Sequence, residues 1–177
     1  KVSDIKNRVD IGNNSNADLF ISIHLNKYPP SEIYRGWQTF YQPSNEDSKN
    51  LASLIQENLN KNIEKCTELN LLLREKLSKY DVVINSNEYS VPQIFNFSII
   101  KMKGNEFVKE ISKYGIYLSS TSACSSSLNY SIVLGEITNG NRDISTTSVR
   151  VSISHLTTKN DIMRFIDIFD KIYNKNN

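Results

Sequence analysis

This 177-residue sequence has few cysteines, little net charge and no long hydrophobic run, and each absence excludes a class of protein. Cys66 and Cys124 are too few for a disulfide framework and too far apart for a zinc site of closely spaced thiolates. The net charge of +2 comes from scattered lysines, so no basic patch predicts a nucleic-acid partner. No apolar stretch approaches the length that a membrane span needs.

The start of the sequence also lacks familiar features. It begins at Lys1 rather than at a methionine, and no signal-peptide pattern follows, so we expect that the true N-terminus is missing. The remaining composition, 38% hydrophobic and 23% charged, is typical of a globular protein. The length fits one ordinary domain or two small ones.

The most distinctive stretch that is present, residues 116–128, places Cys124 in a run of small hydroxyl residues. Between Ser119 and Ser127 no bulky side chain is available to hold the backbone by packing, which favours a mobile arm. A thiol on such an arm is a nucleophile once it is ionised and reaches its target. The alternative, on composition alone, is a serine-rich surface loop with an incidental cysteine.

The first third of the sequence predicts a helix, two strands and a longer helix, and hence an α/β layer. The expected elements are a helix over 2–16, a mostly buried strand over 18–26, a strand over 36–42, and a helix that begins near Ser44, with Asp47 completing its cap, and presents an apolar face over 51–63.

His24 lies near the end of the predicted strand 18–26, a position where α/β enzymes often place a zinc ligand. A catalytic zinc needs three protein ligands, and Asp18 and Glu32 are candidates only because they are near in sequence. The alternative is a single histidine in a partly buried strand.

Residues 8–26, followed by residues 35–41, closely resemble the zinc-dependent N-acetylmuramoyl-L-alanine amidases of bacterial cell walls, most of all their spore-cortex branch. The resemblance covers about residues 1–65. It implies a partial amidase segment in which His24 is one zinc ligand, with peptidoglycan as the partner and the cell envelope or spore cortex as the location. The family's other ligands and its catalytic glutamate have no counterpart, so we expect that zinc is not held completely.

Beyond a junction at residues 66–70 the pattern changes to short strands and amphipathic helices. The expected elements are helices over 71–79, 104–114 (ended by Gly115) and 128–137, strands over 80–85, 91–100, 116–119 and 148–154, a loop over 139–143, and a terminal helix capped by Thr158 and Asp161 whose buried face includes Phe165 and Phe169.

Residues 71–177 resemble the C-terminal small domain of the pyridoxal-phosphate-dependent cysteine desulfurases of the NifS and IscS type. The motifs that carry the resemblance stand in the family's order, at residues 91–98, 119–126, 148–152 and 157–162. The usual glycine before Ser-Ala-Cys is replaced here, with Thr121 and Ser122 at those positions.

The desulfurase resemblance implies a cytoplasmic protein in which Cys124 forms a persulfide and Arg150 binds the substrate carboxylate through its planar fork. Without the resemblance, Arg150 is better explained as a strand arginine in a surface ion pair. The family's cofactor-binding residues have no counterpart here, His155 is expected at the surface, and no cofactor-binding residue is assigned. The implied partner is a protein that donates or accepts persulfide sulfur.

The two resemblances together predict an α/β chain: a partial amidase layer followed by the small α+β domain of a fold-type I pyridoxal-phosphate enzyme. We expect a bacterial fusion that lacks full activity of its own and self-associates through exposed apolar surface. The alternative is an N-acetylmuramoyl-L-alanine amidase that acts in cell-wall or spore-cortex peptidoglycan hydrolysis.

Overall fold

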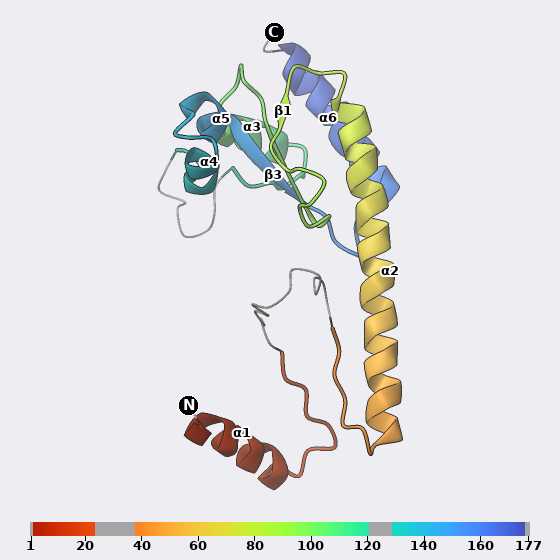
Figure 1. Cartoon of the computed structure of the whole chain (residues 1–177). Helices are drawn as coiled ribbons and strands as arrows, with labels where there is room; N and C mark the ends of the chain where they lie inside the picture. Colours follow the sequence, from red (N-terminus) through yellow and green to blue (C-terminus); the bar gives the residue numbers. More distant parts are fainter. Residues whose placement is uncertain (1, 24–37, 121–128, 176–177) are drawn as a thin grey trace. The chain divides into compact units, whose positions relative to one another are not determined.

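The computed structural model describes residues 2–23, 38–120 and 129–175, so His24 and Cys124 lie outside the described residues. The chain divides into two units, Lys1–Trp37 and Gln38–Asn177, which are treated separately below (Figure 1). In the described ranges, every helix is too short or too polar to cross a bilayer.

The first unit contains one helix, α1 (Val2–Asn14), where a helix was predicted. The strand predicted over 18–26 is wrong in its described part: residues 18–23 are irregular, and Phe20 and Ile23 are 66% and 91% exposed. The strand predicted over 36–42 is likewise absent from residues 38–42. A strand requires a neighbour that pairs with its backbone, and no described segment pairs with either one.

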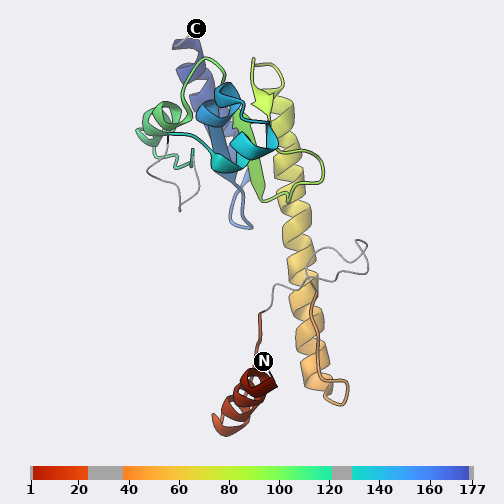
Figure 2. The same cartoon turned by 60° about the vertical axis from the view of Figure 1, so that its left-hand side comes forward.

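The second unit begins with α2 (Glu46–Leu77), which runs without interruption through the predicted junction at 66–70 (Figure 2). No glycine or proline breaks the helix, so the two helical stretches predicted on either side of residues 66–70 form one helix. The cap is Asn45 rather than the predicted Ser44, because Asn45 Oδ1 accepts a hydrogen bond from Ser48 N at 2.9 Å.

Three antiparallel strands form the sheet, in the order β1 (Val83–Ile84), β2 (Ile94–Ser98), β3 (Ser148–Ser152). The alternation along β2 and β3 separates two faces. The core face carries buried apolar side chains: Phe95, Phe97, Val149 and Val151. The opposite face, called the polar face below, carries Asn96, Ser98, Ser148 and Arg150.

Four further helices surround this sheet: α3 (Gly104–Ser112), α4 (Ile132–Ile137), α5 (Arg142–Thr147) and α6 (Lys159–Lys175). The predicted loop over 139–143 is shorter than expected, because Asn141 caps α5. Gly104 begins α3 so close to β3 that a Cβ atom would lie 2.2 Å from the Ser148 carbonyl oxygen. Only glycine permits this approach.

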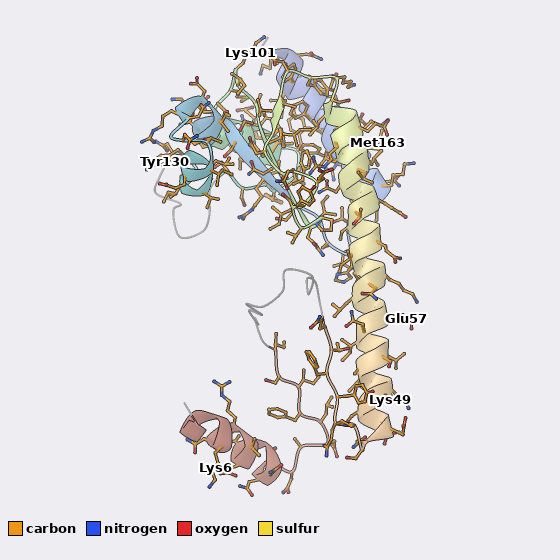
Figure 3. The ribbon with its side chains drawn as sticks, in the orientation of Figure 1. Lys6, Lys49, Glu57, Lys101, Tyr130 and Met163 are labelled. Carbon is orange, nitrogen blue, oxygen red and sulfur yellow. The ribbon has the colours of Figure 1, made fainter. Side chains whose placement is uncertain are left out.

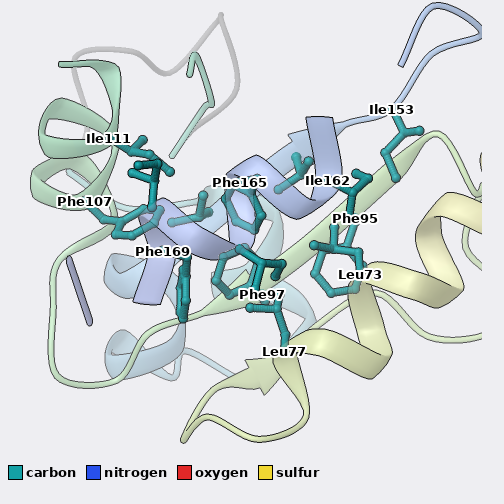
Figure 4. Close-up of a cluster of buried hydrophobic side chains, with 14 of the residues drawn as sticks. Leu73, Leu77, Phe95, Phe97, Phe107, Ile111, Ile153, Ile162, Phe165 and Phe169 are labelled. Carbon is teal, nitrogen blue, oxygen red and sulfur yellow. The ribbon is translucent and has the colours of Figure 1, made fainter. Parts of the chain in front are cut away.

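The core lies between the sheet, the C-terminal half of α2, α3 and α6 (Figure 4). At its centre Phe169 contacts three other phenylalanine rings, with centroid distances of 5.9 Å to Phe97, 5.5 Å to Phe107 and 5.9 Å to Phe165. The buried face predicted for the last helix is confirmed, and so is the α/β fold class. The core thus covers one side of the sheet; on the polar face Ser98 and Ser148 are buried and Ser98 bonds to α5, whereas Asn96 and Arg150 stay half-buried.

Candidate functional site

Arg150 lies in the middle of β3, on the polar face, directly beside the segment that leads toward Cys124. Ser119 N donates to Arg150 O at 3.2 Å, and Arg150 N donates to Ser119 O at 2.6 Å. The next residue after Ser119 is held as well: Ser148 Oγ donates to Ser120 O at 3.4 Å. Strand β3 therefore holds Ser119 and Ser120, the last described residues before Cys124 in sequence.

On its other side Arg150 faces Asn96, its partner in the β2–β3 register. Asn96 Oδ1 accepts a hydrogen bond from Asn85 Nδ2 at 2.7 Å, and Asn85 Nδ2 also donates to Ser98 Oγ at 2.8 Å. Arg150 and Asn96 are half-buried, whereas Ser98 is fully buried. The Arg150 side chain therefore extends from the polar, hydrogen-bonded face of the sheet and not from the apolar core face.

No carboxylate in the described ranges forms an ion pair with Arg150. The ion pairs that these ranges do contain join neighbours in sequence, such as Lys49–Glu46 and Lys61–Glu57 on α2, where Lys49 and Glu57 project outward (Figure 3). The alternative explanation of Arg150, a surface ion pair, thus has no partner among these residues. Its fixed positive charge is available for an anionic ligand.

Cys66, the second cysteine of the chain, is buried and does not fit the role of nucleophile that is predicted for Cys124. It is 1% exposed, its Sγ lies 3.9 Å from Ile153 O, and burial raises the pKa of its thiol. A buried thiol held protonated is inert at neutral pH. His155, expected at the surface, is exposed there, and its carbonyl oxygen accepts a hydrogen bond from Lys65 Nζ at 2.6 Å.

The described residues show no donor set for either parent cofactor. No group of three His, Cys, Asp or Glu side chains in these ranges is placed to hold a metal ion, and Asp18 is exposed; Glu32 lies outside the described residues. On the polar face, β2 and β3 contribute no lysine, which pyridoxal phosphate needs for covalent attachment. The described residues do bring together Arg150, the hydrogen-bonded amides of Asn96 and Asn85, and Ser119, which precedes Cys124 in sequence.

Sequence patterns missed Asn96 and Asn85 as members of this site. The alternation in residues 94–98 does place Asn96 on the same side as Ser98, so its polar face was readable. Its position opposite Arg150 depends on pairing between strands about fifty residues apart in sequence, which no local pattern specifies.

Comparison with known families yields two matches. The family described as N-acetylmuramoyl-L-alanine amidase matches residues 1–91, and the family described as aminotransferase class V matches residues 48–165. The predicted combination of amidase-like and desulfurase-like segments is confirmed. Because the two matches overlap over residues 48–91, the junction at 66–70 stays a prediction.

Individual relatives agree with both families. A germination-specific N-acetylmuramoyl-L-alanine amidase of Bacillus subtilis is 40% identical over 67 residues, which are 38% of this chain and 28% of the relative. Cysteine desulfurase IscS of Dictyoglomus turgidum is 32% identical over 121 residues, which are 66% of this chain and 30% of the relative. The chain therefore spans less than a third of the length of either relative.

Solved structures share the fold of much of this chain. A NifS-like protein superimposes with a TM-score of 0.57 at 20% identity, over 71% of this chain and 32% of its own. A NifS-like protein from Rickettsia africae gives a TM-score of 0.56 at 25% identity, over 80% of this chain and 41% of its own.

Proposed function

This chain belongs to the N-acetylmuramoyl-L-alanine amidase family and to the aminotransferase class-V family, and from this premise we propose that its desulfurase-like part carries sulfur on Cys124. In this proposal Arg150 binds the carboxylate of the amino-acid substrate. The proposal uses neither zinc nor pyridoxal phosphate: the residues that the structure describes show no group of metal ligands, and β2 and β3 contribute no lysine.

The observation that carries the proposal is the paired backbone of Ser119 and Arg150. It joins the strand that bears the arginine to the residues that lead to the cysteine, two groups more than twenty residues apart in sequence. The pairing supports the proposal because it ties the proposed carboxylate ligand, Arg150, to the residues that precede the proposed nucleophile in sequence.

The step proposed for Cys124 is a transfer between persulfides, and it does not itself use the carboxylate-binding role proposed for Arg150. The Cys124 thiolate attacks the terminal sulfur of a persulfide on a donor protein, forming a new S–S bond. The donor's own S–S bond breaks, and its thiolate leaves with the electron pair. Cys124 becomes the persulfide while the donor returns to a thiol, so no other oxidant or reductant takes part.

The proposed partners and locations of this chain differ between its desulfurase-like and its amidase-like part. The desulfurase-like part suits a cytoplasmic partner that donates or accepts sulfur. The amidase-like part, in which His24 is proposed as one zinc ligand, supports a second candidate: a peptidoglycan-binding role at the cell envelope or spore cortex, favoured by the 40% identity to the germination-specific amidase.

The test of sulfur transfer is intact-mass spectrometry after incubation with a persulfide-loaded cysteine desulfurase. We expect the chain to gain one sulfur atom, and peptide mapping to place it on Cys124. Cys66→Ser is the matched control: it should gain the sulfur equally, because Cys66 is buried. Loss of the gain in Cys66→Ser, or its retention in Cys124→Ser, contradicts the proposal.

A further inference from the structure

The polar face contains a chain of hydrogen bonds that fixes the orientation of the Asn96 amide. Ser98 Oγ donates its only proton to Ile144 O at 2.8 Å, because a carbonyl oxygen can only accept. Ser98 Oγ must therefore accept in its other contact, and the group that approaches it at 2.8 Å is Asn85 Nδ2. This contact fixes which end of the Asn85 amide is the NH2 group.

The orientation of Asn85 then sets that of Asn96. The same Asn85 Nδ2 lies 2.7 Å from Asn96, so the atom that receives its second proton is Asn96 Oδ1. The two N–H groups of Asn96 Nδ2 consequently point away from this network. No described residue accepts a hydrogen bond from them.

Backbone pairing brings this amide close to Arg150. The backbone of Asn96 bonds toward β1, where its carbonyl oxygen accepts from Asn85 N at 2.9 Å and Ser86 N at 3.1 Å, while that of Arg150 bonds toward Ser119. Asn96 and Arg150 therefore form a non-hydrogen-bonded antiparallel pair, the kind in which facing Cα atoms are only about 4.5 Å apart and side chains lie closest.

We propose that Asn96 is a second binding residue for the substrate carboxylate, so that its Nδ2 and the Arg150 guanidinium form a two-donor clamp. Arginine supplies charge, and the amide supplies a neutral donor whose direction is set before the ligand arrives. This inference rests on the proposed role of Arg150. The ligand class is an α-amino acid, recognised by its carboxylate.

The experiment uses the full-length chain and two small probes, L-alanine and ethylamine, which differ by the carboxylate. Binding is followed by NMR through the side-chain Nε–H signal of Arg150 and the Nδ2 signals of Asn96. We expect both sets of signals to shift with L-alanine and not with ethylamine.

Asn96→Asp is the decisive variant. Its carboxylate still accepts from Asn85, so the network persists, but the donor is lost and a negative charge faces Arg150. We expect L-alanine to bind at least about tenfold more weakly, the effect of losing one hydrogen bond to a charged ligand. Asn60→Asp is the matched control: Asn60 Oδ1 also accepts from an amide, Gln56 Nε2, at 3.1 Å, and its substitution should leave binding unchanged.

The outcomes separate this inference from the function on which it rests. If Arg150→Lys loses binding but Asn96→Asp keeps it, Asn96 is not part of the clamp and Arg150 retains its role. If the parent chain does not bind L-alanine, or Arg150→Lys binds it unchanged, the clamp and the role of Arg150 both fail, while sulfur transfer to Cys124 is judged by its own test. Should Asn96→Asp not fold, Asn96→Ser takes its place, and parental affinity there overturns the inference.

Discussion

At the scale of single residues, Tyr80 shows how one hydroxyl group links distant parts of the second unit. Tyr80 Oη donates to Asp170 Oδ1 at 2.7 Å, and its ring meets Phe169 edge-on at 4.8 Å. Burial, together with the negative Asp170, raises the pKa of Tyr80 well above its ordinary value of 10.0. The folded state therefore keeps this proton more strongly than the unfolded chain does.

This shift predicts a loss of stability in alkali. Below about pH 10 both states of the chain carry the Tyr80 proton, and its contribution is fully present; as the pH rises further, the unfolded chain releases the proton first, so stability falls. We expect Tyr80→Phe to be less stable than the parent at pH 8, and this difference to shrink above pH 10. Urea unfolding at both pH values measures it, and a difference that grows with pH contradicts the assignment.

The two cysteines differ at the same scale. Cys66 belongs to the core of the second unit, with an exposed fraction of 1% and a raised pKa, so it is structural. Its environment explains why a mass gain on this chain should arise at Cys124 alone. The sequence already set Cys124 apart by its run of small hydroxyl residues, whereas the burial of Cys66 follows from the fold.

At the scale of elements, the start of α2 offers a direct comparison between two candidate caps. Sequence spacing favoured Ser44, whereas the structure assigns the cap to Asn45. We expect Asn45→Ala to cost about 1 kcal/mol locally and so to speed hydrogen exchange of the Ser48 amide about fivefold. Ser44→Ala should leave this exchange unchanged. Faster exchange in Ser44→Ala than in Asn45→Ala would instead assign the cap to Ser44.

Helix α2 lies largely within the region, residues 48–91, that both family matches cover. Its first half has one buried residue, Ala52, while its second half contributes buried residues from Cys66 to Leu77. The second half is held by core packing, and the first half continues the same hydrogen-bonding ladder. A change of family along the chain therefore need not coincide with a change of structure.

At the scale of the whole molecule, all described members of the buried apolar cluster, from Cys66 to Ile172, belong to the second unit. We expect deletion of residues 1–37 to leave the free energy of unfolding of the second unit unchanged. Phe97→Ala, a core truncation, should lower it by about 3–5 kcal/mol. Urea unfolding compares the three chains, and a large loss on deletion would show that the first unit contributes to this core.

The same deletion tests self-association. The exposed side chains of Leu19, Phe20, Ile21 and Ile23 form an apolar run in the first unit, and such runs favour contact between copies. Sedimentation velocity over a range of concentrations should show association of the full-length chain that is weakened without residues 1–37. Equal association of both chains would place the contact elsewhere.

The sequence by itself predicted most of the helices, the alternation of β2 and β3, and both family relationships, because these depend on local periodicity and motif order. It did not predict α5 or the continuity of α2. Tertiary structure alone decided what the strand-like residues 18–23 become, since a strand exists only where a neighbour pairs with it. It likewise decided that Arg150 lies between Ser119 and Asn96. Register between distant strands is set by packing of the whole sheet, which no single segment of sequence encodes.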